Sequence, residues 1–137
     1  MKNLATSVSA ERALAYAANT AATVTGLTID TQGCYELTFF VFCHAVAAGD
    51  SSNKYTIAVY ESDDSGMSGE TAITDTTRLV GSLYDVLTAD ANAVKKLGVI
   101  ISPNKRYVRI KFIETGTADA TLSGIVLKHP LRHAPPS

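Results

Sequence analysis

Two histidines near the end of the chain could bind a metal ion. His129 and His133 are four residues apart in the stretch LKHPLRHAPPS, and His44 is the third histidine of the sequence. Three imidazoles are a possible ligand set for zinc. Pro135 and Pro136 stop a helix here, however, and an extended chain rising ~3.3 Å per residue would place His129 and His133 about 13 Å apart. We therefore expect an extended, basic tail rather than a shared metal site.

Four carboxylates gather in the stretch ESDDSGMSGE. Glu61, Asp63 and Asp64 are close in sequence, and Glu70 follows them. A calcium loop needs oxygen ligands at alternating positions and a closing bidentate acid. Asp63 and Asp64 are adjacent, so their side chains point apart on an extended chain. The favoured interpretation is a solvated hairpin loop, and a calcium site is the alternative.

A short row of polar side chains recurs with the period of a strand. Tyr107, Arg109 and Lys111 share one face if this stretch is extended, and such a row could contact a polyanion. The chain has 12 Lys and Arg against 13 Asp and Glu, a net charge of −1. Nucleic-acid binders normally carry a basic excess. We expect a solvated or partner-facing strand face and no direct contact with nucleic acid.

No combination of residues predicts catalysis. Cys43 as a nucleophile would need a base beside it, and no such constellation is visible, so we interpret it as a small buried residue. Cys34 and Cys43 would lie about 30 Å apart on one strand, too far for a disulfide. The sequence contains no Gly-rich phosphate loop, G-x-S-x-G or H-E-x-x-H motif. We therefore expect neither an enzyme nor a cofactor.

Length and composition indicate one globular domain. The chain has 137 residues, of which 46% are hydrophobic, enough for a single core without metal or disulfides. No apolar run reaches the length of a membrane span, and Glu11 and Arg12 interrupt the region where a signal peptide would be apolar. We expect no membrane association, and synthesis and assembly in the cytoplasm.

Alternating apolar residues predict the strands that carry these side chains. The clearest case begins at Tyr35, where every second residue is apolar. The core face of this strand is expected to contain Tyr35, Leu37, Phe39, Val41, Cys43 and Ala45. The opposite face contains Phe40 and Phe42 among polar residues, so we expect it to be half-buried against a partner or another element.

Further strands are separated by short turns rich in Gly, Asp, Asn and Ser. They are KYTIAVYES, KLGVIIS, RYVRIKFIE and ATLSGIVLKH, with TAATVTGLTID and RLVGSLYDV as weaker candidates. Many short strands without helical connections predict an all-β fold, a single antiparallel β-sandwich of jelly-roll type.

The two ends of the chain are expected to be extended arms. We assign residues 1–20 to an N-terminal arm, residues 21–130 to the jelly-roll domain and residues 131–137 to a C-terminal tail. The stretch SAERALAYAAN is open to a second interpretation, a short helix capped by Ser9, because it is rich in strong helix formers.

Several segments in order resemble a known protein family. IDTQGCYELTFFV, YESDD, KRYVRIKF and the ending HPLRHAP are similar to segments of small tailed-phage virion proteins, the capsid cement or decoration proteins, some of them jelly rolls from podophages. The resemblance covers residues 29–135. The family ending usually reads His-Pro-Arg-His, whereas Leu131 intervenes here, which shifts the side-chain alternation of the tail.

The resemblance implies a structural protein without catalysis or cofactor. Such proteins bind the outside of a shell of HK97-like major capsid protein, commonly as homodimers that bridge neighbouring capsomers, so the expected location is the exterior of the virion capsid. The residues that we expect to contact capsid or sister subunits are Leu4, Leu14, Tyr16, Phe40, Phe42, Lys128, His129, Leu131, Arg132 and His133.

Two other functions remain open from the sequence. A carbohydrate-binding jelly roll on the virion surface would present aromatic rings beside Asp or Asn, and Tyr60 near Asp63 is the only such pair to note. A head–tail completion protein would form rings rather than dimers.

Overall fold

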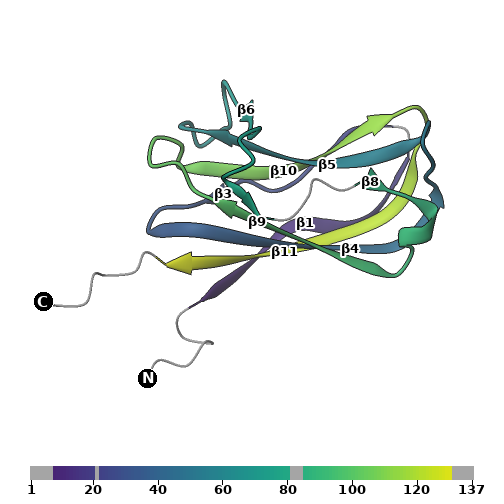
Figure 1. Ribbon diagram of the computed structural model, residues 1–137, viewed down its shortest axis with the longest axis horizontal. Coiled ribbons are helices and arrows are strands. Elements are labelled where there is room, and N and C mark those ends of the chain that lie inside the picture. The colour runs from purple at the N-terminus through teal and green to yellow at the C-terminus, as the bar shows by residue number, and fades with distance from the viewer. Residues whose placement is uncertain (1–7, 21, 81–84, 131–137) are drawn as a thin grey trace, which may run out of the picture.

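Two antiparallel β-sheets pack face to face, as the computed structural model in Figure 1 shows. The structure describes residues 8–20, 22–80 and 85–130. The predicted all-β antiparallel sandwich is confirmed. The five-stranded sheet contains, in spatial order, β1 (Ser9–Thr20), β11 (Asp119–Pro130), β4 (Cys34–Ala48), β9 (Ala93–Ile100) and β7 (Leu79–Val80).

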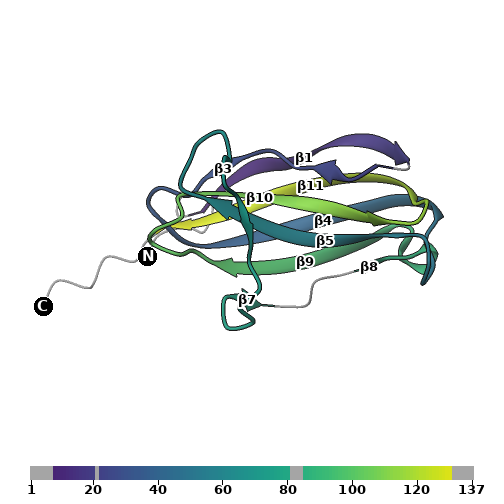
Figure 2. The same cartoon turned by 90° about the horizontal axis from the view of Figure 1, so that it is seen from above.

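The second sheet has six strands, several of them short. β2 (Val24–Thr25) and β3 (Ile29–Asp30) both pair with β10 (Tyr107–Thr115), β10 pairs with β5 (Lys54–Ser62), and β6 (Thr71–Ala72) and β8 (Asp85–Val86) both pair with β5. A single 3-10 turn, η1 (Thr88–Asp90), precedes β9 among the described residues. Figure 2 shows the strand order from above, with β1 at one edge of the sandwich and β7 at the other.

Most strand pairs are nested: the first strand pairs with the last, and strands nearer the middle of the chain pair with each other. β1 pairs with β11, β2 and β3 pair with β10, β4 pairs with β9, and β5 pairs with β6 and β8. Three further ladders complete the sheets: β11 with β4, β10 with β5, and the short β7 with β9. Strands far apart in the sequence are therefore neighbours, and β1 begins at the end of the sandwich where β11 finishes (Figure 1).

The predicted alternation of the long strands is confirmed. The core between the sheets contains the predicted inward residues Leu37, Phe39, Val41, Cys43, Tyr55, Ile57, Val59, Leu97, Val99, Val108, Ile110 and Phe112. Both cysteines lie on β4 and are free thiols, with Cys43 buried as expected.

The alternation of β4 changes near its end, which makes part of the prediction wrong. Ala45 is exposed and Val46 is buried instead. Cys43 pairs with Leu122, whereas Ala45 pairs with Thr121, so two residues of β4 oppose one residue of β11. Such a β-bulge reverses the faces of the residues that follow it. At the other end of the strand, Tyr35 is only half-buried.

The helix alternative for the N-terminal stretch is wrong, because residues 9–20 form strand β1. It pairs with β11 from Ser9 opposite Lys128 to Thr20 opposite Asp119, with two irregularities in between. Ala13 and Leu14 are buried in the core. Helix propensity is a weak preference, and a long ladder that also buries two apolar side chains overrides it.

A buried ion pair joins the two sheets at the edge near β7. The Arg78 guanidinium donates two hydrogen bonds to Glu61 on β5 and one to the carbonyl of Ile100 at the end of β9. The two side chains are 20% and 9% exposed. Glu61 raises the pKa of Arg78 above its usual value, chiefly through these hydrogen bonds. The pair therefore connects β5 in one sheet to β9 in the other.

We expect Arg78→Ala to lower the free energy of unfolding by about 3 kcal/mol, because it leaves the Glu61 carboxylate buried without its partner. Arg106→Ala is the matched control. Arg106 also binds a carboxylate with two hydrogen bonds, that of Asp30, but those side chains are 47% and 45% exposed, so the loss should be much smaller. Chemical denaturation of both variants measures the difference, and equal losses would contradict the proposed effect of burial.

Candidate functional site

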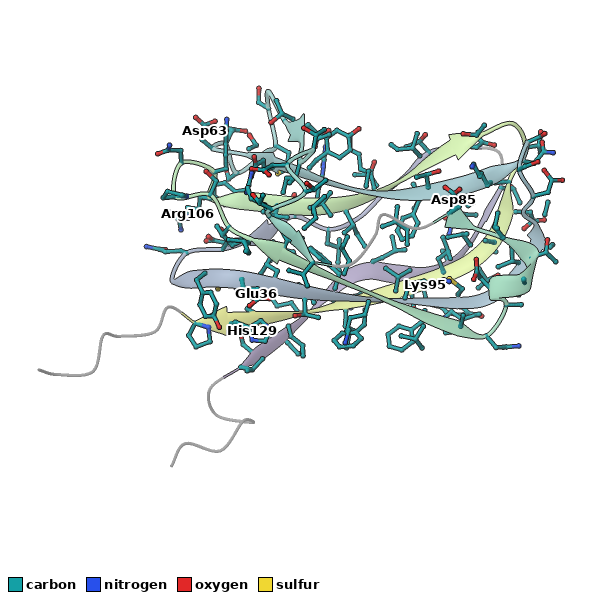
Figure 3. The ribbon with its side chains drawn as sticks, viewed as in Figure 1. Glu36, Asp63, Asp85, Lys95, Arg106 and His129 are labelled. Carbon is teal, nitrogen blue, oxygen red and sulfur yellow. The ribbon has the colours of Figure 1, made fainter. Side chains whose placement is uncertain are left out.

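Four of the expected contact residues lie on one surface, the outer face of the five-stranded sheet. Phe40 and Phe42 are half-buried on the side of β4 opposite the core. His129 pairs with Glu36 across the ladder between β11 and β4. The centres of the Tyr16 and His44 rings are 5.0 Å apart, so these two side chains lie on the same surface. Figure 3 shows Glu36 and His129 on the side of their sheet that faces away from the other sheet.

Cross-strand pairing extends this surface beyond the predicted residues. Phe40 lies between Ile125 of β11 and Lys96 of β9, and Phe42 pairs with Val94. Directly opposite residues of antiparallel strands share a face, so Val94 and Ile125 point outward as well. We define the apolar face as Tyr16, Phe40, Phe42, Val80, Val94, Ile100, Ile125 and Leu127.

The short strand β7 adds Val80 to the apolar face. Val80 pairs with Gly98 of β9. A Cβ atom at position 98 would lie 3.1 Å from the Cβ of Val80, so the glycine lets the valine side chain pack closely over β9. Val80 nevertheless remains 57% exposed.

Exposed apolar side chains are concentrated on this surface. Of the six large hydrophobic residues that are exposed in the described part of the chain, five belong to the apolar face, including Tyr16 at 69% and Val94 at 53%. The four long strands of this sheet, ~4.8 Å apart and each taken over about eight residues, present roughly 400 Å² in projection. Patches of this size on a monomer are often functional, and about 800 Å² of accessible surface per partner is usual in a stable interface.

Two histidines on the same surface each form a hydrogen bond with the hydroxyl group of a neighbouring strand. His44 Nε2 lies 2.7 Å from Ser123 Oγ, and His129 Nε2 lies 3.0 Å from Thr38 Oγ1. The His44–Ser123 distance would suit a base and a nucleophile. No carboxylate of the described residues contacts the second nitrogen of His44, and Ser123 lies within a ladder, where backbone N–H groups pair with neighbouring strands. The arrangement lacks the orienting acid and the oxyanion donors of a hydrolase.

The structure separates the residues that could have formed a metal site. His44 lies at the bulge of β4, whereas His129 pairs with Glu36 near the start of this strand, roughly 26 Å away at ~3.3 Å per residue. The third histidine, His133, lies outside the described residues. Within the described ranges no three His, Cys, Asp or Glu side chains are grouped to hold a metal ion.

Three carboxylates of the acidic stretch ESDDSGMSGE each bind a different partner. Glu61 pairs with Arg78, Asp64 accepts backbone N–H groups of Gly66 and Ser68, and Glu70 binds Arg109. These carboxylates stabilise the loop and its attachment to the sheet, rather than converging on one point as calcium ligands would.

The remaining expected contact residues do not add to the apolar face. Leu14 is in the core and 5% exposed, because β1 turns it inward opposite Gly124. Lys128 binds Glu11 at 3.0 Å. Four others, Leu4, Leu131, Arg132 and His133, lie outside the described residues, as does the whole tail 131–137.

A cleft lies at one end of the sandwich. It has a volume of about 470 Å³ and lies between residues 31–35 and 101–106. Its one cation, Arg106, is occupied by Asp30 and Gln32. This pairing holds the pKa of Asp30 at about 2. The cleft therefore offers little unpaired charge for a ligand.

The outer face of the six-stranded sheet is occupied by its own loop. Glu70 binds both Arg109, at 2.8 Å, and Lys111, and Lys111 Nζ lies 4.6 Å from the centre of the Tyr60 ring. The predicted outward row of Tyr107, Arg109 and Lys111 exists, but Arg109 and Lys111 share the carboxylate of Glu70. The hydrogen bond from Arg109, together with Lys111, holds the pKa of Glu70 below its usual value.

We expect Glu70→Gln to lower the free energy of unfolding at neutral pH by about 1–2 kcal/mol, because charge-assisted hydrogen bonds become neutral ones. A carboxylate with a lowered pKa stabilises the fold above its usual value near 4.5 and loses that effect as the pH falls through the lowered pKa. The difference between wild type and variant should therefore shrink on acidification. A constant difference from pH 7 to pH 3 in denaturation curves would refute the role of Glu70.

No helix in the described part of the chain is long and apolar enough to span a membrane. Comparison of the chain with protein-family models, with curated proteins and with solved structures gave no match. The apolar face of the five-stranded sheet is therefore the feature on which a functional proposal has to depend.

Proposed function

We propose that this protein is a non-catalytic virion protein that binds the outside of a phage capsid shell through its apolar face. The observation that carries the proposal is the concentration of exposed apolar side chains on one side of a two-sided sandwich. A rigid sheet with such a face suits contact with another protein, because burying apolar surface supplies most of the energy of association.

The strand pairing supports a jelly roll, the fold that the family resemblance implies. In a jelly roll, a long antiparallel hairpin winds into two sheets, so that its first and last strands pair and the inner pairs nest within them. The ladders of this chain follow that pattern, from β1 with β11 to β5 with β6 and β8, and the short ladder of β7 with β9 is an addition to it. Jelly rolls occur in viral capsid proteins and in lectins, and the segment resemblance favours the capsid function over the lectin function.

The proposed partners are an HK97-like major capsid protein and a second copy of this chain. A protein that binds only the expanded, DNA-filled shell stabilises that state by mass action. A homodimer that contacts two capsomers gains further, because its second contact forms within the same assembly at high effective concentration. The protein would thus cement neighbouring capsomers on the virion exterior.

Binding to purified shells tests this function. The protein is mixed with expanded and with immature heads of the phage that encodes it, and the heads are sedimented. We expect stoichiometric binding to expanded heads, and at least tenfold weaker binding of Val94→Asp, because an unpaired carboxylate would be buried in the contact. Ala72→Asp, an exposed position on β6 of the other sheet, is the matched control and should bind like wild type.

The result of this binding experiment distinguishes capsid binding from the other functions. Absence of binding to either form of the shell would refute the proposal. Equal weakening by the two substitutions would show that the apolar face is not the contact. A clear ligand in a glycan screen would instead favour the carbohydrate-binding function.

A truncation after Pro130 tests the proposed contact of the tail. The strand β11 includes Lys128, His129 and Pro130, which pair with β4, so removing only residues 131–137 leaves the described ladders complete. We expect an unchanged melting temperature and weaker binding to expanded heads, because Leu131, Arg132 and His133 are removed. Unchanged affinity would refute a contact role for the tail.

A further inference from the structure

A single row of paired residues crosses the apolar face from β1 to β9. Arg12 pairs with Ile125, Ile125 pairs with Phe40, and Phe40 pairs with Lys96. Since directly opposite residues share a face, all four side chains point outward. Two cations thus flank two apolar side chains, with backbones about 14 Å apart across three strand spacings of ~4.8 Å.

These two cations are unusual in the molecule, because most others bind a carboxylate. Among the described residues, the paired cations are Lys54, Arg78, Lys95, Arg106, Arg109, Lys111 and Lys128. Arg12 and Lys96 are exposed and have no such partner within the described ranges, and the same holds for the half-buried Lys105. Two of the three unpaired cations therefore lie in one row of the apolar face.

The charges of the row disfavour two alternative occupants. A face-to-face dimer with its two-fold axis centred on the row would place Arg12 opposite Lys96 or opposite another Arg12, and like charges in contact destabilise an interface. Nucleic acid would need many phosphate contacts. Here two cations flank an apolar centre, and Glu36 on the same face would repel phosphates.

We propose that the apolar face docks on a protein surface whose apolar centre is flanked by two carboxylates, one meeting Arg12 and the other meeting Lys96. This inference rests on the proposed function and specifies the patch of the shell protein that the face recognises. The long apolar stems of Arg12 and Lys96 extend the apolar contact, while their charged ends select acidic groups at its rim. Such rim charges guide association and exclude partners with the wrong charge.

Charge reversal at the row tests the inference. Lys96→Glu and Arg12→Glu are each compared with Lys105→Glu, which makes the same change of net charge in the turn between β9 and β10. Binding to expanded heads is measured at low and at physiological salt. We expect at least tenfold weaker binding at low salt for the two row variants, binding within twofold of wild type for Lys105→Glu, and wild-type affinity that falls as salt rises.

The other possible results distinguish failure of the acidic partner from failure of the proposed function. Melting temperatures equal to that of wild type establish that the variants are folded, as expected for side chains that bind no carboxylate. If wild type binds heads and the row variants bind equally well, the acidic partner is refuted while the proposed function stands. If wild type does not bind heads, both are refuted. If the row variants change only the self-association of the free protein in sedimentation, the occupant is a second copy and the inference is wrong.

Discussion

The alternation of side chains along β4 is the constraint on which the rest of the molecule depends. β4 pairs with β11 on one side and with β9 on the other, so its backbone groups are satisfied and its side chains can point only inward or outward. Leu37, Phe39 and Val41 therefore form the centre of the core, and Phe40 and Phe42 must lie outside. The same pleat that builds the core thus creates the apolar face.

The two outer faces of the sandwich have opposite character. On the six-stranded sheet, the loop between β5 and β6 supplies Glu70 to Arg109 and Lys111, so both of these cations have a carboxylate partner. On the five-stranded sheet, the flanking cations Arg12 and Lys96 have no carboxylate among the described residues. The proposed contact through the apolar face would therefore give the protein a defined orientation on its partner.

Local patterns predicted the strands and the core well, and failed where distant segments decide the structure. The strand over residues 107–115 follows directly from the alternation of Val108, Ile110 and Phe112. The bulge that exposes Ala45 depends on how β11 pairs with β4, and the strand β1 depends on a partner more than a hundred residues away. For the same reason the sequence pointed to Phe40 and Phe42, but not to Val94 and Ile125, which join them only through cross-strand pairing.

The pairing of β1 with β11 also has a consequence for folding. Ser9 and Lys128 are partners, and a ladder between segments so distant must close a very long loop, which slows its formation. The inner pair of β5 with β6 spans far fewer residues and can form early. The nested ladders therefore favour early pairing in the middle of the chain and later pairing of β1 with β11, the ladder that places Arg12 beside Ile125. The flanking charges of the apolar face would then be complete only in a fully folded subunit, and an incompletely folded chain would compete poorly for the proposed contact.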